Sequence, residues 1–216
     1  VVAWLNGRMM LLSTLFALAA MLTFARWLDG SRFRWAAATV VLVTLCMMSK
    51  VRVGVPALLM IVAIALRHRV NVRSFLLGSL CVAITAFFVV INWKTTADSE
   101  FFSLAGEHMT GPRLVRVFRS LAWYVQHFVW PTGLASWYPA PPSVSWSDPQ
   151  TPPAILTVLA ATALVAWGCR KSVPALLGAA WFLCTLVDTL PIVPARNVLA
   201  ADRYMYLSIT GLLWIV

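Results

Sequence analysis

The residues best suited to chemistry in this chain are cations and tyrosines that stand at the ends of long apolar runs. An arginine guanidinium can bind two phosphate oxygens at once, and a lysine adds a point charge. Both interactions gain strength in low-dielectric surroundings. The sequence therefore predicts a phosphate-binding site, and its candidate residues are Lys50, Arg52, Arg196, Arg203, Tyr204 and Tyr206.

A plainer explanation exists for these residues. Lys50 and Arg52 could simply extend their charged ends to water while their stems lie along apolar surface. Asp202 stands just before an apolar run, where a carboxylate caps a helix and suits the positive end of its dipole, and it could pair with Arg203. The prolines, arginines and tyrosines concentrated between 190 and 206 nevertheless favour a site over capping alone.

A carboxylate that accepts a proton from a hydroxyl would complete a group-transfer site. The candidates are Glu107, Asp148 and Asp202. An exposed loop carboxylate is more often a solvated surface group, so the catalytic residue stays unknown. His108 and His127 form no zinc-ligand pattern with the four cysteines, and no glycine-rich phosphate loop is present. We therefore predict no metal site and no resident cofactor.

These residues lie in a chain whose composition suits a bilayer. Hydrophobic residues make up 61% of it and charged residues only 11%, which is typical of a polytopic membrane protein. Seven apolar runs cover residues 9–28, 35–48, 53–66, 74–92, 153–168, 172–190 and 204 to the end. We predict an all-α, polytopic transmembrane helical bundle with about seven spans, although the second and third runs are shorter than the ~20 residues a span needs.

The uneven distribution of basic residues predicts the orientation. Segments 26–34, 67–73 and 170–171 hold eight basic residues against one acid, so the positive-inside rule places them in the cytoplasm. This bias explains much of the net charge of +10, so nucleic acid is not an expected partner. We expect a multi-pass protein of a bacterial inner membrane or an ER-like membrane, with its active face external.

The long external segment 93–152 is expected to contain one more helix. Between residues 112 and 130, apolar side chains recur at helical spacing, while Arg113, Arg116 and Arg119 project elsewhere. This pattern predicts an amphipathic helix along the external interface, with its leucines and aromatics toward lipid or the bundle.

Four segments stand out in order along the chain. They are Val2-Ala3-Trp4-Leu5-Asn6-Gly7-Arg8, then Ser49-Lys50 with Pro56 downstream, then the stretch from Tyr124 to Pro131 ending in Leu134 and Tyr138, and last Ala201-Asp202-Arg203-Tyr204-Met205-Tyr206-Leu207-Ser208. In this order they resemble the membrane region of the transmembrane, tetratricopeptide-repeat O-mannosyltransferases and their bacterial relatives. Each segment is short, but together they extend over nearly the whole chain.

That resemblance implies an integral-membrane glycosyltransferase of the GT-C type. Such an enzyme moves a sugar, mannose in the named family, from a polyprenyl-phosphate donor to a protein or glycan acceptor on the external face. The resemblance also implies an acidic catalytic residue in an earlier external loop and repeats after the membrane region. We therefore expect residues 1–216 to be a partial domain, in keeping with a chain that opens at Val1 and ends in an apolar run. The chain departs from its relatives at Val51, where they often carry an acid, and at Asp202, where they carry glutamate.

Two other classes of membrane protein are alternatives. A lipid or solute transporter, or a flippase, would carry charges at midplane depth and an internal repeat, and neither is visible in the sequence. A non-catalytic membrane module would show scattered external charges without paired arginine and tyrosine at helix starts.

Overall fold

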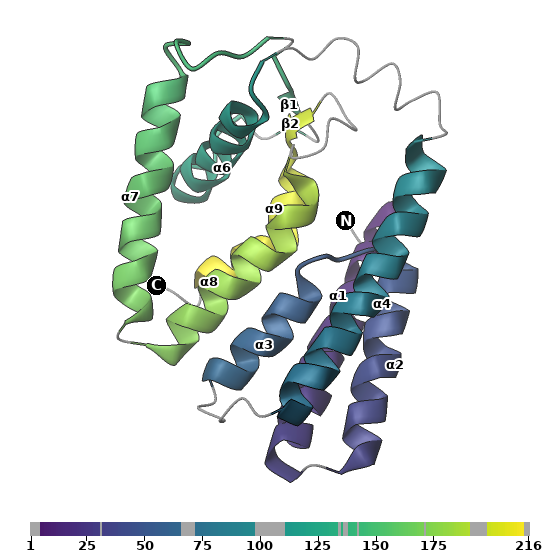
Figure 1. The fold of residues 1–216 in the computed structure, drawn as a ribbon. Helices are drawn as coiled ribbons and strands as arrows, with labels where there is room; N and C mark the ends of the chain where they lie inside the picture. Colours follow the sequence, from purple (N-terminus) through teal and green to yellow (C-terminus); the bar gives the residue numbers. More distant parts are fainter. Residues whose placement is uncertain are drawn as a thin grey trace. The chain divides into compact units, whose positions relative to one another are not determined.

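The computed structural model describes residues 5–30, 32–65, 72–97, 111–133, 135, 138–141, 143–170, 172–190 and 198–213. Within these ranges the chain has eight α-helices and one small two-stranded sheet (Figure 1). The predicted all-α class is therefore confirmed. The fold divides into two compact units, residues 1–94 with 183–188, and residues 95–182 with 189–216.

Three helices in the described ranges are long and apolar enough to cross a bilayer, namely Gly7–Gly30, Val72–Thr95 and Thr151–Cys169. The prediction of about seven spans is therefore wrong. The other predicted runs form helices shorter than the ~20 residues that a crossing needs. These are α2 (Phe33–Ser49), α3 (Val55–Ala65), α8 (Val173–Leu186) and α9 (Asp202–Leu213). The orientation was derived by alternating sides over seven crossings, so it stays a prediction.

The first unit is built on α1 (Leu5–Gly30), α2, α3 and most of α4 (Val72–Ala97). Helices α1 and α2 run side by side (Figure 1). The small residues Ala17 and Ala20 are buried on α1, which lets neighbouring helices approach closely. The hydroxyl groups of Thr23 and Thr39 lie 3.0 Å apart and join the two helices by a hydrogen bond. Bonds of this kind stabilise helix pairs where there is no water to compete.

The second unit contains α6 (Arg113–Val129), α7 (Thr151–Cys169), α9 and the first part of α8. The predicted helix at 112–130 is confirmed as α6, whereas its position at a membrane interface stays a prediction. Helix α6 packs against α7 (Figure 1). Strand β1 (Tyr138–Pro139) pairs antiparallel with β2 (Val198–Ala200).

A hydrogen bond and a close backbone approach fix α9 against α8 within the second unit. The indole Nε1 of Trp181 donates to the carbonyl oxygen of Leu207 at 2.9 Å. A Cβ atom at Gly211 would collide with the carbonyl oxygen of Gly178, so glycine is required where the two helices touch. The start of α9, where Asp202 lies, is therefore held on a rigid element.

Candidate functional site

The predicted site residues fall in both units, so each group is described separately. Lys50 and Arg52 belong to the first unit, and Asp148, Asp202 and Tyr204 to the second. Glu107 and Arg196 lie outside the described residues, as do the side chains of Arg203 and Tyr206 on α9. The prediction that Lys50 and Arg203 share one phosphate therefore stays a prediction.

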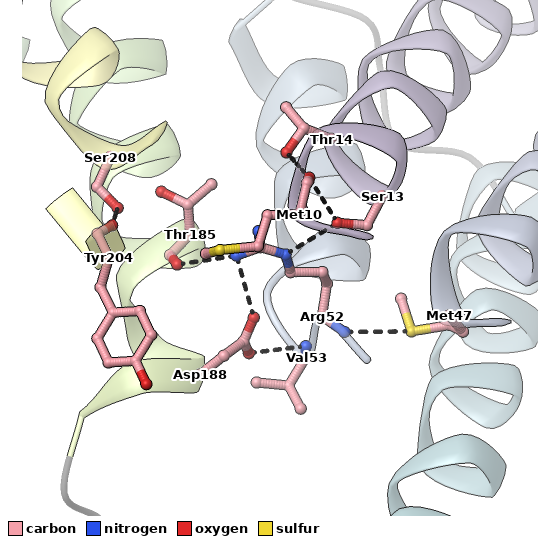
Figure 2. Close-up of polar contacts among 10 residues, drawn as sticks. All are labelled: Met10, Ser13, Thr14, Met47, Arg52, Val53, Thr185, Asp188, Tyr204 and Ser208. Atoms are coloured by element: carbon pink, nitrogen blue, oxygen red, sulfur yellow. Dashed lines mark hydrogen bonds and ion pairs between the residues drawn. The ribbon is translucent and has the colours of Figure 1, made fainter. Parts of the chain in front are cut away.

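Arg52 lies in the turn between α2 and α3 and is only 4% exposed. Its Nη1 donates to the carbonyl oxygen of Thr185 at 3.3 Å and lies 3.7 Å from Oδ2 of Asp188. Its Nε lies 3.4 Å from the Ser13 hydroxyl, to which it donates (Figure 2). Lys50, two residues earlier, ends α2, with its backbone N–H donating to the carbonyl oxygen of Cys46. Arg52 is thus engaged inside the first unit, where its Nη2 has no hydrogen-bond partner among the described residues.

Asp188 is the partner that sequence reasoning missed. It lies in the short 3-10 turn η1 (Val187–Thr189) after the end of α8, and its Oδ1 accepts the Val53 N–H at 3.0 Å (Figure 2). Burial raises the pKa of Asp188 to about 6, although Arg52, the Val53 N–H and Lys50 act to lower it. The only sequence signal for this contact was that Arg52 and Asp188 carry opposite charges and stand at the ends of two apolar runs.

The turn that carries Arg52 also packs tightly against α8. A Cβ atom at Gly54 would collide with the carbonyl oxygen of Cys184. Together with the bonds to Thr185 and Asp188, this contact fixes the turn after α2 to the end of α8. The arrangement holds a buried cation in one place.

In the second unit, Asp202 lies beside Tyr138. The Tyr138 hydroxyl is 3.5 and 3.4 Å from the two carboxylate oxygens of Asp202. The same hydroxyl accepts the Ala135 N–H at 2.7 Å and is 2.9 Å from the carbonyl oxygen of Gly133. Burial, followed by the Asp202 charge, raises the pKa of Tyr138, while the Ala135 N–H opposes this. Asp202 therefore meets a neutral phenol.

A second tyrosine joins α6 to the start of α9. The Tyr124 hydroxyl accepts the Ala201 N–H at 3.2 Å, and its side chain is fully buried. Burial raises the pKa of Tyr124 to about 12, against the lowering effect of the Ala201 N–H. Tyr204, which was predicted to shape a phosphate site, is buried, and its carbonyl oxygen accepts the Ser208 hydroxyl.

Three aromatic rings form a cluster next to Tyr124. The rings of Trp123 and His127 stack with centroids 3.7 Å apart, and the Tyr138 ring centroid lies 4.3 Å from that of Trp123. All three side chains are half-buried. The cluster was not predicted, although the spacing of four residues between Trp123 and His127 indicates neighbours on one helix face.

Asp148, the other described candidate for a proton acceptor, is occupied differently. Its Oδ2 forms an ion pair with Nη2 of Arg119 at 2.8 Å. The Asp148 carboxylate is therefore already engaged by a cation. Asp202 is therefore the better placed of the two described carboxylates.

In the part of the chain that the structure describes, no group of three or more His, Cys, Asp or Glu side chains could hold a metal ion. Comparison of the chain with known protein families, curated proteins and solved structures finds no match.

Proposed function

We propose that this chain is part of an integral-membrane glycosyltransferase. It would move a sugar such as mannose from a polyprenyl-phosphate donor to a protein or glycan acceptor on the external face. One observation carries the proposal. Two of the segments that resemble the family, 124–138 and 201–208, contact each other in the structure. Tyr138 closes the first segment, Asp202 is the second residue of the other, and they make contact although 64 positions separate them.

The remaining contacts between these segments support the same proposal. Strands β1 and β2 pair Tyr138 with Ala200, and the Tyr124 hydroxyl accepts the Ala201 N–H. One side-chain contact and one strand pairing therefore fix the backbone just before Asp202. Catalytic groups are expected on such rigid supports, because small displacements of a reacting group cost large factors in rate.

The chemistry needs a proton acceptor and a cation. The bond between the sugar C1 and the donor phosphate oxygen breaks, and the phosphate leaves with the electron pair. The acceptor hydroxyl oxygen forms the new bond to C1, and its proton passes to a carboxylate. In this proposal Asp202 is that carboxylate, in place of the acidic residue that the resemblance implies in an earlier external loop. Tyr138 orients Asp202, and Arg203 stabilises the growing charge on the phosphate.

Sugar transfer by the complete protein tests the proposal. Membranes containing it would be supplied with a labelled polyprenyl-phosphate mannose, and labelled protein or glycan would be counted. Asp202→Asn should lower the rate by about a hundredfold or more, the range expected for loss of a general base. Tyr138→Phe should lower it by about tenfold, since one hydrogen bond to a charged group is lost. Asp29→Asn, on exposed surface at the end of α1, is the matched control and should leave the rate unchanged.

Two outcomes would overturn the proposal in different ways. Parental transfer by Asp202→Asn would remove Asp202 from the role of base. Absence of transfer by the parent protein, together with uptake of the labelled lipid across sealed vesicles, would favour the transporter instead.

A further inference from the structure

The amphipathic helix α6 buries Arg116 and Arg119 of its polar face, whereas Arg113 in its first turn is exposed. Arg116 is 3% exposed and Arg119 8%, whereas Leu114 on the same helix is 62% exposed. Ser120 is fully buried on the same face as the two arginines, because residues spaced by three and four positions are neighbours on a helix. Two guanidinium groups and a hydroxyl therefore point into the second unit.

The proline- and serine-rich segment after β1 covers this face. Nη1 of Arg116 donates to the carbonyl oxygen of Pro141 at 2.8 Å, and Arg119 pairs with Asp148. A Cβ atom at Gly111, which has a φ of 98°, would collide with the carbonyl oxygen of Val144. The segment therefore lies directly against the beginning of α6.

Two buried polar atoms on this face lack a hydrogen bond. Nε of Arg119 and the hydroxyl oxygen of Ser120 have no partner among the described residues. Buried polar groups without partners are rare in folded proteins, and each needs an explanation. A tetrahedral anion would supply acceptor oxygens to both groups at once, because the guanidinium fork matches phosphate geometry.

We infer that Arg119 and Ser120, with Arg116 beside them, form a binding site for a phosphate group. The carboxylate of Asp148 then holds the place of the anion when no phosphate is bound. Its side chain is 37% exposed while that of Arg119 is 8% exposed, so the ligand reaches the guanidinium from the Asp148 side. Burial, and then the charge of Arg119, lower the pKa of Arg116, which shows that the charges of the two arginines interact.

The phosphate could belong to a membrane lipid or be free in solution, and the two sources are separable. The inference rests on the proposed function only for identifying a polyprenyl phosphate as the lipid. The complete protein in phosphatidylcholine nanodiscs would be dialysed against labelled inorganic phosphate, and separately titrated with farnesyl phosphate. Tighter binding of farnesyl phosphate identifies a lipid ligand, equal binding identifies a free phosphate, and either result supports the site.

Two substitutions distinguish a binding site from a structural ion pair. Arg119→Gln should weaken phosphate binding by about ten- to a hundredfold, since a charge-assisted contact is lost. Asp148→Asn should strengthen it by about tenfold, because the competing anion is gone. Arg113→Gln changes an exposed arginine on the same helix and should have little effect.

If Arg119 and Asp148 formed only a structural ion pair, both substitutions would change phosphate binding in the same direction. That result, or a parent protein that binds neither phosphate probe, would overturn the inference. Binding is measured without sugar transfer, so the two proposals fail separately. If the protein binds phosphate but transfers no sugar, only the proposed function is refuted. If it transfers sugar but binds no phosphate at Arg119 and Ser120, only the proposed site is refuted.

Discussion

Replacing Asp188 by asparagine tests which force dominates at its buried pair with Arg52. The asparagine keeps a side-chain oxygen for the Val53 N–H but carries no charge. Burial raises the pKa of Asp188 to about 6 in spite of Arg52 and Lys50, so the loss of hydration outweighs their attraction. We therefore expect the asparagine variant to be at least as stable as the parent at pH 7.

The magnitude follows from the pKa. The difference between about 6 in the folded protein and the ordinary value of 3.8 corresponds to about 3 kcal/mol. Because the folded pKa is raised, the folded state binds this proton more tightly than the unfolded state. Asp188 therefore contributes stability that is fully present below pH 3.8 and is lost as the pH rises to about 6. In Asp188→Asn this side chain does not titrate, so the variant should not lose this stability as the pH rises.

Unfolding by SDS in mixed micelles, followed by tryptophan fluorescence between pH 4 and 8, measures the difference between parent and variant. Asp29→Asn removes an exposed carboxyl of the same unit and is the matched control for the loss of one carboxyl group. Asp188→Ala also removes the acceptor of the Val53 N–H, so it should cost about 1–3 kcal/mol relative to the asparagine variant. If the parent gained stability relative to Asp188→Asn as the pH rose from 4 to 6, attraction by Arg52 would dominate and the reasoning would be refuted.

Three further predictions concern topology, the phosphate cation and packing. In a background without the native cysteines, Arg69→Cys and Ser143→Cys should react with an impermeant thiol reagent from opposite sides of the membrane; labelling from one side would contradict the orientation. Arg203→Ala should lower donor-dependent transfer by about ten- to a hundredfold, and Arg203→Lys should recover only part because it lacks the fork; a parental rate in the alanine variant would make this arginine structural. Gly54→Ala should destabilise the protein to SDS by about 1–3 kcal/mol through overpacking against α8, whereas Gly30→Ala, with open space around it, is the control.

Helix α6 shows what the sequence could predict well. Its apolar side chains repeat at helical spacing between 112 and 130, and the helix runs over Arg113–Val129. Such a periodic pattern specifies a helix locally, without knowledge of any distant contact.

The number of spans shows where local pattern fails. An apolar run measures composition, whereas a span needs an unbroken helix of ~20 residues. Helix α2 ends at Ser49 and α3 has 11 residues, so the runs that contain them are too short to be counted as full spans. The apolar runs gave an upper bound on the number of crossings.

Long-range pairs could not be predicted from one sequence. Val53 and Asp188 are 135 positions apart, and their contact depends on how the end of α8 packs within the first unit. The contact of Tyr138 with Asp202 was suggested only by the order of the segments that resemble a family, because no periodicity connects a loop to a helix start. Candidate residues were therefore predictable by type, whereas their partners were not.

The direction in which α6 faces depends on its solvent. In water, a helix with this pattern buries its apolar stripe and exposes its arginines. Here Arg116 is 3% exposed, and Leu114 is 62% exposed. That arrangement is favourable where a lipid phase covers the apolar stripe, since leucine in hydrocarbon costs nothing and an unpaired arginine there costs several kcal/mol. The predicted interfacial position of α6 would explain why Arg116 and Arg119 turn inward to the carbonyl oxygen of Pro141 and the carboxylate of Asp148, and how a polar site could form directly beneath an apolar surface.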